Sequence, residues 1–405
     1  MTVEATGVDR IGSGDFDTYP VDHEITGATV DERTVRVNWD DGHVSRFHFV
    51  WLRDNCPDCI HPETREPMFD ITLLQKDLSP RSVDVTPEGG LQVVWSDNEH
   101  SSHYHPGWLR HHCYTNSANG QNSEPVLWDS TASIELHRFS WADIVVDEEG
   151  ETSWLQSIAT TGYALAYDVP VTPDSVAEVA GRIGVIRDTN FGRFWDVTTR
   201  PDPNSAAYTG IKLPPHTDLP TREYQPGLQV LHCLTNTVDG GASVLVDGFR
   251  VADEIRERHP NIFQLLTTVP WDFGNRSRTS DYRWRAPMIG LNADGGFDEV
   301  RAGRFLRVPL RVQFDLVEPL YDAYRLFESL SCDPRFQITF RLEPGECLIF
   351  DNRRVLHGRE AFNSETGERH LRGCYVDRDE LHSAIRILER SRRVQRARQP
   401  DLSQG

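Results

Sequence analysis

The second half of the chain is dominated by short apolar runs separated by turn residues. Asp-Gly-Gly at 239–241 and Glu-Pro-Gly at 343–345 punctuate them, and periodic segments at 249–259 and about 314–330 predict helices. The runs lie at 228–234, 243–246, 336–342 and 347–350. Strands this short, which do not alternate regularly with helices, favour a mainly β sandwich or jelly roll with flanking helices over a parallel βαβ sheet.

A β-rich region also precedes this half, between residues 27 and about 110. Residues 34–40 alternate apolar and polar, and Asp41-Gly42 is a hairpin signal before a further extended segment, 43–52. Helical character follows at 152–159 and 173–184. Because residues 114–125 are rich in Asn, Ser and Gly, we expect a linker there. The predicted organisation is a tail over 1–26, a β domain over 27–113, the linker, a second domain over 126–395 and a tail over 396–405.

The charge balance narrows the classes of partner. The formal net charge is -20, and all basic residues except Lys76 and Lys212 are arginine. An acidic surface repels nucleic acid and anionic membranes, so we expect neither as a partner. A well-solvated acidic protein is the simple interpretation. A salt-adapted host is the sharper hypothesis, because ions screen the self-repulsion of excess acid.

The sequence carries no indication of export. No run approaches the ~18 apolar residues of a membrane span, and the N-terminus, MTVEATGVDRIGSGDFD, has neither the basic patch nor the apolar stretch of a signal peptide. The seven cysteines are odd in number and irregular in spacing, which disfavours a disulfide framework. We therefore expect a cytoplasmic protein.

His216-Thr217-Asp218 places an imidazole and a carboxylate two residues apart. On a strand, residues i and i+2 point to the same face, so the two side chains converge on one point. His357, which follows a predicted strand in FDNRRVLHGRE, is the candidate for a third ligand. Two histidines and one carboxylate form the facial triad that leaves open positions on Fe(II). A surface turn after two prolines is the alternative for the tripeptide alone.

Arg369 lies twelve residues after His357, in GERHLRGCY. A 2-oxoglutarate co-substrate carries a distal carboxylate that needs a fixed counter-charge, and the planar guanidinium of arginine binds a carboxylate through two parallel hydrogen bonds. The spacing to a candidate iron ligand singles out this arginine, whereas a surface position is the default for the others.

Ordered segments along nearly the whole chain, from about 27 to about 390, resemble the γ-butyrobetaine dioxygenase and trimethyllysine dioxygenase family within the taurine dioxygenase-like group. They are FVWLRDNCPDCIHPETR, VVWSDNEHSSHYHPGWL, NSAAYTGIKLPPHTDLP, PGLQVLHCLTNTVDGGASVLVDGF, DNRRVLHGREAF and RHLRGCYVDRDEL. The resemblance implies a small N-terminal zinc-binding-type β domain and a double-stranded β-helix (jelly-roll) oxygenase domain. It implies that His216, Asp218 and His357 hold iron, that Arg369 pairs with 2-oxoglutarate, and that Ser243 lies near the same carboxylate.

The resemblance also implies the reaction. Enzymes of this family use Fe(II), 2-oxoglutarate and O2, with ascorbate as reductant, to hydroxylate a small quaternary-ammonium substrate, which here points first to γ-butyrobetaine and its conversion to carnitine. Related halogenases have a small residue in place of the carboxylate, so Asp218 favours hydroxylation. The alternatives within the class are trimethyllysine and another betaine or an aminophosphonate. The alternatives outside it are a catalytically silent metal-binding or sensing module and a zinc hydrolase, which would leave Arg369 without a role. The family further suggests a homodimer.

A quaternary ammonium has no hydrogen to donate, so proteins recognise it with aromatic faces. The resemblance implies a cage whose walls are Phe191, Trp195, Tyr208 and Tyr375; core packing is the alternative for each ring alone. The sequence departs from the family at other pocket positions, which leaves the identity of the amine open. These are Ser205 for a polar Asn or Asp, Leu219 for a frequent tyrosine, and Ala302-Gly303 for an asparagine pair associated with the substrate carboxylate.

The resemblance implies a zinc site of three cysteines and one histidine in the N-terminal domain. Cys56, Cys59 and His100 match three of these positions, and the remaining cysteine is missing. Because tetrahedral zinc needs four ligands, we consider His61 and His103 as the fourth. A degenerate, metal-free site and a redox pair are the alternatives for Cys-x-x-Cys.

Overall fold

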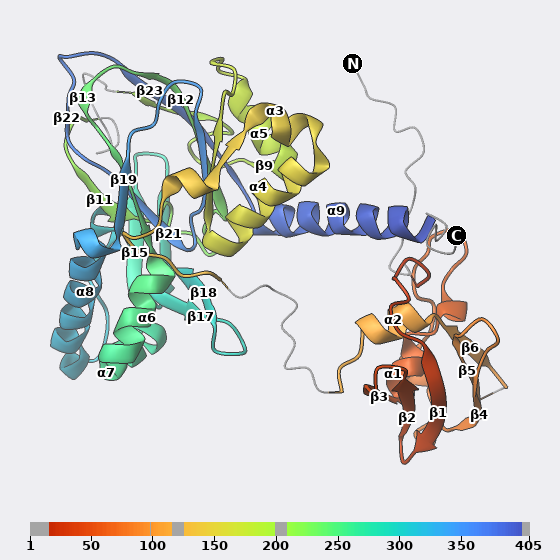
Figure 1. The fold of residues 1–405 in the computed structure, drawn as a ribbon. Coiled ribbons are helices and arrows are strands. Elements are labelled where there is room, and N and C mark those ends of the chain that lie inside the picture. The colour runs from red at the N-terminus through yellow and green to blue at the C-terminus, as the bar shows by residue number, and fades with distance from the viewer. Residues whose placement is uncertain (1–15, 98, 116–124, 199–208, 399–405) are drawn as a thin grey trace. The chain divides into compact units, whose positions relative to one another are not determined.

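The computed structural model describes residues 16–97, 99–115, 125–198 and 209–398. The chain divides into two compact units (Figure 1). Unit 1 consists of residues 1–122 and 389–405, and unit 2 of residues 123–388. The last helix, α9 (Arg378–Arg398), contributes to both units. Among the described residues, no helix is long and apolar enough to cross a membrane.

Unit 1 contains two three-stranded antiparallel sheets, each followed by a short helix. Its shared core includes the fully buried side chains of Val35, Trp95 and Leu109. The first sheet and its helix are β1 (Ile25–Asp31), β2 (Thr34–Trp39), β3 (Val44–His48) and α1 (Phe49–Asp54). The second group is β4 (Pro80–Val85), β5 (Leu91–Trp95), β6 (Ser101–Tyr104) and α2 (Pro106–His111).

The predicted hairpin at Asp41-Gly42 is confirmed. Gly42 has φ 81°, a left-handed conformation that glycine adopts without strain, and β2 and β3 pair in antiparallel register. The extended segment that we predicted to reach residue 52 stops at His48. Helix α1 follows at once, because Phe49 and Leu52 are buried together on one side of it.

Unit 2 is a sandwich of a seven-stranded and a four-stranded sheet, in which every pair is antiparallel except β7 and β8. The large sheet has the order β10-β23-β12-β20-β8-β7, with β9 beside β23, and the small sheet has the order β11-β21-β14-β19. The large sheet contains β7 (Arg138–Ser140), β8 (Tyr163–Tyr167), β9 (Ile186–Arg187), β10 (Trp195–Thr198), β12 (Leu228–Asn236), β20 (Cys347–Asp351) and β23 (Arg369–Val376). The small sheet contains β11 (Leu213–His216), β14 (Ser243–Asp247), β19 (Gln337–Phe340) and β21 (Val355–Arg359). The predicted mainly β fold with flanking helices is confirmed, and the arrangement fits a jelly roll.

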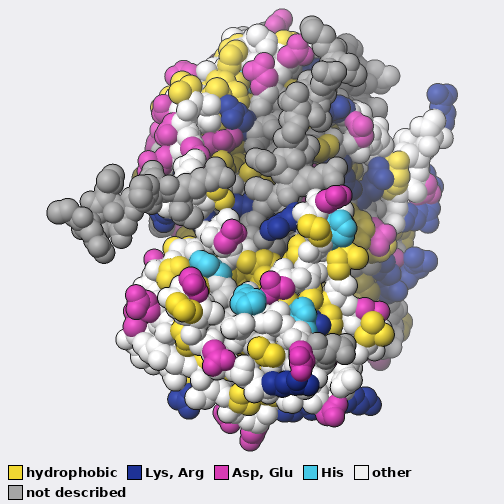
Figure 2. Space-filling model, turned by 90° about the vertical axis from the view of Figure 1, so that its right-hand side faces the viewer, with side chains coloured by type: hydrophobic (Ala, Val, Ile, Leu, Met, Phe, Trp, Pro, Cys, Tyr) yellow, Lys and Arg dark blue, Asp and Glu magenta, His cyan; other side chains and the backbone are white. Residues whose placement is uncertain are grey.

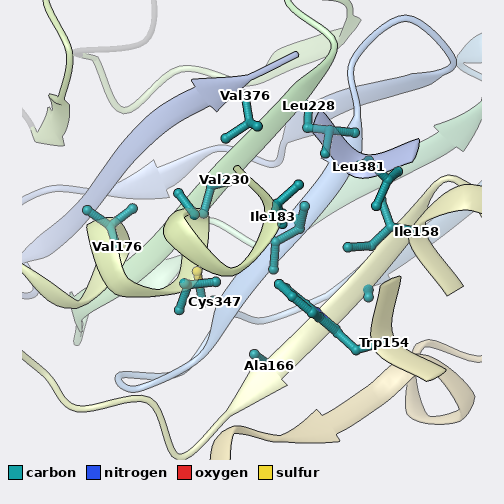
Figure 3. Packing of buried hydrophobic residues seen from close by; sticks show 14 of the residues in the cluster. Trp154, Ile158, Ala166, Val176, Ile183, Leu228, Val230, Cys347, Val376 and Leu381 are labelled. Atoms are coloured by element: carbon teal, nitrogen blue, oxygen red, sulfur yellow. The ribbon is translucent and has the colours of Figure 1, made fainter. Parts of the chain in front are cut away.

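Side-chain alternation along the strands of the large sheet creates two cores. In β12, Leu228 and Val230 face an outer core that is covered by helices, whereas Leu231 and Cys233 face an inner core between the sheets. Figure 3 shows the outer core, where side chains of α4 (Glu148–Thr161) and α5 (Ser175–Ile183) pack on the sheet. A side chain at an inward position of the large sheet therefore meets the small sheet, and this is where the candidate site lies.

A third core joins three further helices of unit 2 to two hairpins. These helices are α6 (Gly248–Arg258), α7 (Pro260–Thr268) and α8 (Val317–Ser331). The helices predicted at 249–259, 314–330, 152–159 and 173–184 correspond to α6, α8, α4 and α5. The other elements are α3 (Trp141–Val146), β13 (Asp239–Gly240), β15 (Trp271–Arg276), β16 (Asp281–Ala286), β17 (Ile289–Leu291), β18 (Phe297–Val300) and β22 (Phe362–Asn363).

The distribution of charge agrees with the acidic composition. Acidic side chains are scattered over the face shown in Figure 2, and they do not gather in a single patch there. Most arginines of unit 2 that are buried donate hydrogen bonds to backbone carbonyls or to acids, as Arg354 does to Asp247 at 2.8 Å.

The seven cysteines are free thiols.

Candidate active site

Three potential metal ligands meet at one end of the small sheet. His216 is the last residue of β11, and its register partner on β21 is His357, with the two ring centroids 4.3 Å apart. Asp218 follows two residues later, and one ligand atom from each of the three side chains lies within 4.8 Å of the others. The pairing of two strands thus brings together three residues that are separated by up to 141 positions in the sequence.

The orientation of the donors suits a divalent metal. Oδ1 of Asp218 lies 3.6 Å from Nε2 of His216 and 3.9 Å from Nε2 of His357. Nδ1 of His216 lies 3.0 Å from the carbonyl oxygen of Pro214, so this nitrogen carries the ring hydrogen and Nε2 presents its lone pair to the site. Two imidazole nitrogens and one carboxylate oxygen match the facial donor set of iron(II) oxygenases.

Asp218 does not lie on a strand, which differs from the reasoning that predicted its direction. Strand β11 ends at His216, and Leu219 has a positive φ of 52°. The side chain of Asn352 holds the aspartate in place. Its Oδ1 accepts from the backbone N–H of Asp218 at 2.6 Å, and its Nδ2 donates to the carbonyl of Asp218 at 3.0 Å and to that of Pro226 at 3.1 Å. Sequence reasoning missed Asn352, because nothing in the sequence reveals a contact across 134 residues.

The protonation states also favour metal binding. Burial by itself raises the pKa of Asp218, but His357, His216 and the hydroxyl of Tyr375 outweigh burial and hold this pKa well below its usual range. Burial lowers the pKa of His357 to about 3. At neutral pH the carboxylate is therefore ionised and this imidazole is neutral, which are the forms that ligate a cation.

Arg369 is a buried guanidinium without a counter-charge from the part of the chain that the structure describes. It begins β23, its side chain is only 7% exposed, and its Nε has no hydrogen-bond partner. No described residue forms an ion pair with it, whereas the nearby Arg341 and Arg359 donate to backbone carbonyls. Burial lowers its pKa to about 10, so it remains charged at neutral pH. A buried charge of this kind is costly unless an anion joins it, and a ligand carboxylate meets that need.

Ser243 lies on the inner face of the small sheet, since Leu245 two residues later belongs to the inner core. Its register partner is Arg359 on β21. Arg359 donates to the carbonyl of Ile211 at 2.8 Å, just before the strand that carries His216. The hydroxyl of Ser243 therefore lies in the same interior as Arg359. Within the described residues, Ser243 makes no direct contact with Arg369.

Two of the four aromatic residues predicted for the cage come together. The rings of Trp195 and Tyr375 are 5.3 Å apart, and the hydroxyl of Tyr375 donates to Oδ2 of Asp218 at 2.7 Å. Trp195 lies against Gly373, where an added Cβ would be 2.5 Å from the indole ring. Phe191 is 44% exposed and has no ring contact among the described residues, and Tyr208 and the neighbouring Ser205 lie outside the described residues.

A further aromatic ring, from Phe305, borders the trio of potential metal ligands, which are His216, Asp218 and His357. It meets the ring of His216 edge to face at 4.9 Å and is itself exposed. The preceding segment runs beside the iron-binding motif, since the backbone N–H of Thr217 donates to the carbonyl of Ala302 at 2.8 Å. Residues 302 and 303, where the sequence departs from the family, thus lie next to the trio. No spacing rule in the sequence points to Phe305.

Unit 1 holds a second cluster of potential ligands. Cys56, Cys59 and His100 come together, with Nε2 of His100 3.2 Å and 3.5 Å from the two sulfur atoms. The hydroxyl of Ser102 donates to Cys56, and the guanidinium of Arg53 donates to Cys59 at 3.2 Å. Burial raises the pKa of the Cys56 thiol to about 12. The two sulfurs and one nitrogen are suitable donors for zinc, which displaces the thiol protons on binding.

Neither residue considered as a fourth ligand joins this cluster. His103 turns away, with Nδ1 3.1 Å from the carboxylate of Asp58. Nδ1 of His61 instead accepts from the backbone N–H groups of Glu63 and Thr64. Within the described residues, the cluster therefore has three protein ligands.

The fold and these donor sets define a class, a mononuclear oxygenase on a jelly roll. Comparison with known proteins gives the family. Residues 128–375 match the taurine catabolism dioxygenase TauD, TfdA family, and residues 27–110 match the γ-butyrobetaine hydroxylase-like N-terminal family. The chain belongs to the TauD, TfdA family and is a 2-oxoglutarate-dependent dioxygenase that resembles γ-butyrobetaine dioxygenases. Dependence on Fe(II) and 2-oxoglutarate, a small-molecule substrate and O2 follow from this membership.

Individual relatives are similar over nearly their full length. The chain is 42% identical over 380 residues to the γ-butyrobetaine dioxygenase of Pseudomonas sp. (strain AK-1), covering 93% of this chain and 99% of the relative. It is 31% identical to the trimethyllysine dioxygenase of Meyerozyma guilliermondii, covering 91% of this chain and 96% of the relative. It is 29% identical to the γ-butyrobetaine dioxygenase of Homo sapiens, covering 87% of this chain and 94% of the relative.

Proposed function

We propose that this dioxygenase hydroxylates γ-butyrobetaine to carnitine. The observation that carries the proposal is the buried Arg369, which forms no ion pair with any described residue and lies in the same interior as the trio of His216, Asp218 and His357. The trio can bind a metal, and Arg369 can bind a co-substrate that carries a carboxylate. A hydrolase or a catalytically silent module would not need this carboxylate-binding arginine. The identity of the substrate is supported by the 42% identical relative, which is named a γ-butyrobetaine dioxygenase.

Each residue of the site has a role in this proposal. Fe(II) is held by His216, Asp218 and His357. Arg369 binds the distal carboxylate of 2-oxoglutarate, and the hydroxyl of Ser243 lies near the same carboxylate. Iron and 2-oxoglutarate together supply the oxidation of an unactivated C–H bond by O2, with succinate, carbon dioxide and the alcohol as products, and ascorbate keeps the iron reduced. The protein positions the reactants and excludes water.

The aromatic side chains select the cation. Trp195 and Tyr375 offer two aromatic faces next to Asp218, with ring centroids 5.3 Å apart. The family resemblance assigns the other two walls of the cage to Phe191 and Tyr208. Cation–π attraction and burial hold the trimethylammonium group. Because the cage fixes one end of the substrate, it also determines which carbon faces the iron.

A second candidate substrate is trimethyllysine. It carries the same trimethylammonium group, and a trimethyllysine dioxygenase is 31% identical over 389 residues. The presence of Ala302-Gly303 beside Thr217 favours keeping this candidate, because these two residues have no side-chain donor for the carboxylate of γ-butyrobetaine. Other betaines and aminophosphonates fit the same cage.

We further propose that residues 27–113 form a zinc-binding domain in which Cys56, Cys59 and His100 are ligands and a water molecule takes the fourth position. Metal analysis of Cys56→Ser protein tests this proposal, since zinc content equal to that of the wild-type protein would contradict it.

We also propose that residues 126–395 form the oxygenase domain and that the protein is a cytoplasmic homodimer. Gel filtration with light scattering tests the dimer.

The central experiment is succinate formation by anaerobically iron-loaded protein that receives 2-oxoglutarate, ascorbate and oxygen. The panel contains γ-butyrobetaine, trimethyllysine, trimethylaminoethylphosphonate and a neutral isostere of γ-butyrobetaine. We expect strong turnover with γ-butyrobetaine and none with the isostere. Turnover with trimethyllysine alone would replace the substrate, and equal turnover with the isostere would exclude recognition by a cation cage.

A further inference from the structure

Gln229 is an inward-facing residue of β12 that none of the roles above uses. Its two sequence neighbours, Leu228 and Val230, both belong to the outer core, so the side chain between them points to the inner core. Its register partners are Tyr375 on β23 and Phe350 on β20. Gln229 therefore lies between these two side chains on the inner face of the large sheet.

Both neighbours of Gln229 touch the proposed iron ligands. The hydroxyl of Tyr375 is hydrogen bonded to Asp218, and the ring of Phe350 lies 4.8 Å from the ring of His357. An inward side chain between Tyr375 and Phe350 therefore lies close to the same ligands. This position on β12 is distinct from that of Arg369, which lies opposite Asn236 at the far end of the strand.

The amide of Gln229 has no hydrogen-bond partner among the described residues. The residue is only 2% exposed, Oε1 is buried without a hydrogen bond, and no described residue is hydrogen bonded to the side chain. Gln225, a buried glutamine of the same unit, also has an unpaired Oε1, but its Nε2 donates to the carbonyls of Val300 and Asn352. A buried carbonyl oxygen that loses its water without gaining a donor is costly, so a bound molecule is the expected partner.

The chemistry of the reactants limits what this partner is. 2-Oxoglutarate is a dianion that offers only acceptors, and a quaternary ammonium has no hydrogen to donate. With the amide oriented as in the structure, Oε1 needs a donor, and among water, the reactants and the product that donor is an O–H group. We infer that the amide oxygen of Gln229 accepts a hydrogen bond from an O–H group held beside the iron ligands. This inference rests on the proposed hydroxylation, because the O–H group belongs either to a water molecule that precedes the substrate or to the new hydroxyl group of the product.

Two variants and one control test the inference. Gln229→Met removes donor and acceptor at similar volume, and Gln229→Glu keeps an acceptor. Gln337→Met is the control, because the amide of Gln337 already donates to the carbonyl of Ser331 at 2.9 Å. Calorimetry on anaerobic protein with Fe(II) and 2-oxoglutarate gives the dissociation constants of γ-butyrobetaine and carnitine. The ratio of the two constants cancels any general change in the attraction of cations.

If the product hydroxyl is the donor, Gln229→Met raises the ratio of the carnitine constant to the γ-butyrobetaine constant by about fivefold, and the other two variants leave it unchanged. If water is the donor, Gln229→Met instead increases oxygen consumption with 2-oxoglutarate in the absence of substrate. An equal rise of the ratio in Gln229→Glu would assign the effect to packing and overturn the inference.

Wild-type values in both measurements for Gln229→Met would also overturn the inference. If wild-type protein binds neither γ-butyrobetaine nor carnitine, the proposed substrate is contradicted. Oxygen consumption in the absence of substrate would still decide whether Gln229 holds a water molecule. The two failures are thus separable.

Discussion

The hydroxyl of Tyr375 donates a 2.7 Å hydrogen bond to Oδ2 of Asp218, while the ring of the same residue lies 5.3 Å from that of Trp195. One side chain thus takes part in the aromatic pair and supports the carboxylate of the trio. The two contributions are separable, because the ring can be kept while the hydroxyl is removed. Tyr375 therefore offers a direct test of how the proposed cation cage and the proposed metal centre depend on each other.

Tyr375→Phe should weaken metal binding and leave the binding of a quaternary amine nearly unchanged. Loss of a hydrogen bond that orients a ligating carboxylate typically costs about 10- to 100-fold in metal affinity. Competitive titration with Co(II) or Fe(II) measures the first effect and calorimetry the second. Tyr224→Phe is the control, since the side chain of Tyr224 is exposed. Wild-type metal affinity in Tyr375→Phe would show that the hydroxyl does not support the carboxylate.

Arg369→Met should stabilise the ligand-free protein and abolish its stabilisation by 2-oxoglutarate. The substitution removes an unpaired buried charge, which is worth about 1–4 kcal/mol where a hydrophobic side chain of similar volume replaces it, and it removes the partner of the co-substrate. Thermal midpoints with and without 2-oxoglutarate provide the measurement. Arg341→Met should instead destabilise the protein, because it leaves the carbonyls of Asn236 and Val238 without their donor. The same loss of stability in both variants would mean that Arg369 serves the fold.

Gly373→Ala should weaken substrate binding without affecting iron or 2-oxoglutarate. The new methyl group would lie 2.5 Å from the ring of Trp195 and must displace it. We expect the dissociation constant of γ-butyrobetaine to rise about tenfold, corresponding to about 1.4 kcal/mol of lost cation–π and packing energy. Gly181→Ala is the matched control, because no atom lies within 4 Å of the added carbon at that position. Unchanged amine affinity in Gly373→Ala would remove Trp195 from the cage.

Asn352→Leu should reduce both the stability of unit 2 and its affinity for metal. The substitution removes three hydrogen bonds and leaves the buried backbone groups of Asp218 and Pro226 unpaired, which costs about 1–3 kcal/mol for each group. Denaturant unfolding and metal titration measure the two effects. Gln225→Met leaves these bonds in place and should lower stability with little effect on metal affinity. Equal metal affinity in both variants would argue against a positioning role for Asn352.

His232 should make the protein less stable as the pH falls from about 6.5 to 4. Its ring is fully buried, neither nitrogen has a hydrogen-bond partner among the described residues, and burial lowers its pKa to about 4. Below pH 6.5 the unfolded chain binds a proton that the folded protein does not, so stability is lost over this interval, by about 2 kcal/mol at pH 5. Thermal midpoints of wild-type protein and His232→Leu at pH 7.5 and 5 test this prediction. Parallel shifts of the two proteins would show that His232 does not cause the loss.

Sequence reasoning succeeded where a pattern is local. Short runs bounded by Gly and Pro marked the strands, and the helices at 249–259 and 173–184 appear as α6 and α5. It also selected the three side chains that the pairing of β11 with β21 brings together. The assumption that Asp218 continues the strand was wrong, because the strand ends at His216 and long-range contacts take over.

What the sequence could not supply is the set of neighbours from distant segments. Asn352 reaches Asp218, Phe305 borders His216, and Gln229 lies between two inward rings, all through pairing that no spacing rule contains. Predicted pocket residues met the same limit. Phe191 has no ring contact among the described residues, although its place in the family pattern suggested a wall of the cage.

Arg369 and Tyr375 stand on the same inward face of one strand, six residues apart. At ~3.3 Å per residue, β23 fixes a distance of roughly 20 Å between these two residues, which are the proposed binding positions for the co-substrate carboxylate and for the substrate cation. Inserting a single residue between them would rotate one of the two to the outer face, so this span cannot lengthen in small steps. We therefore expect enzymes that take longer or shorter amines to differ in the segments around Phe191 and Phe305. Insertions in these segments leave the spacing between Arg369 and Tyr375 on β23 unchanged.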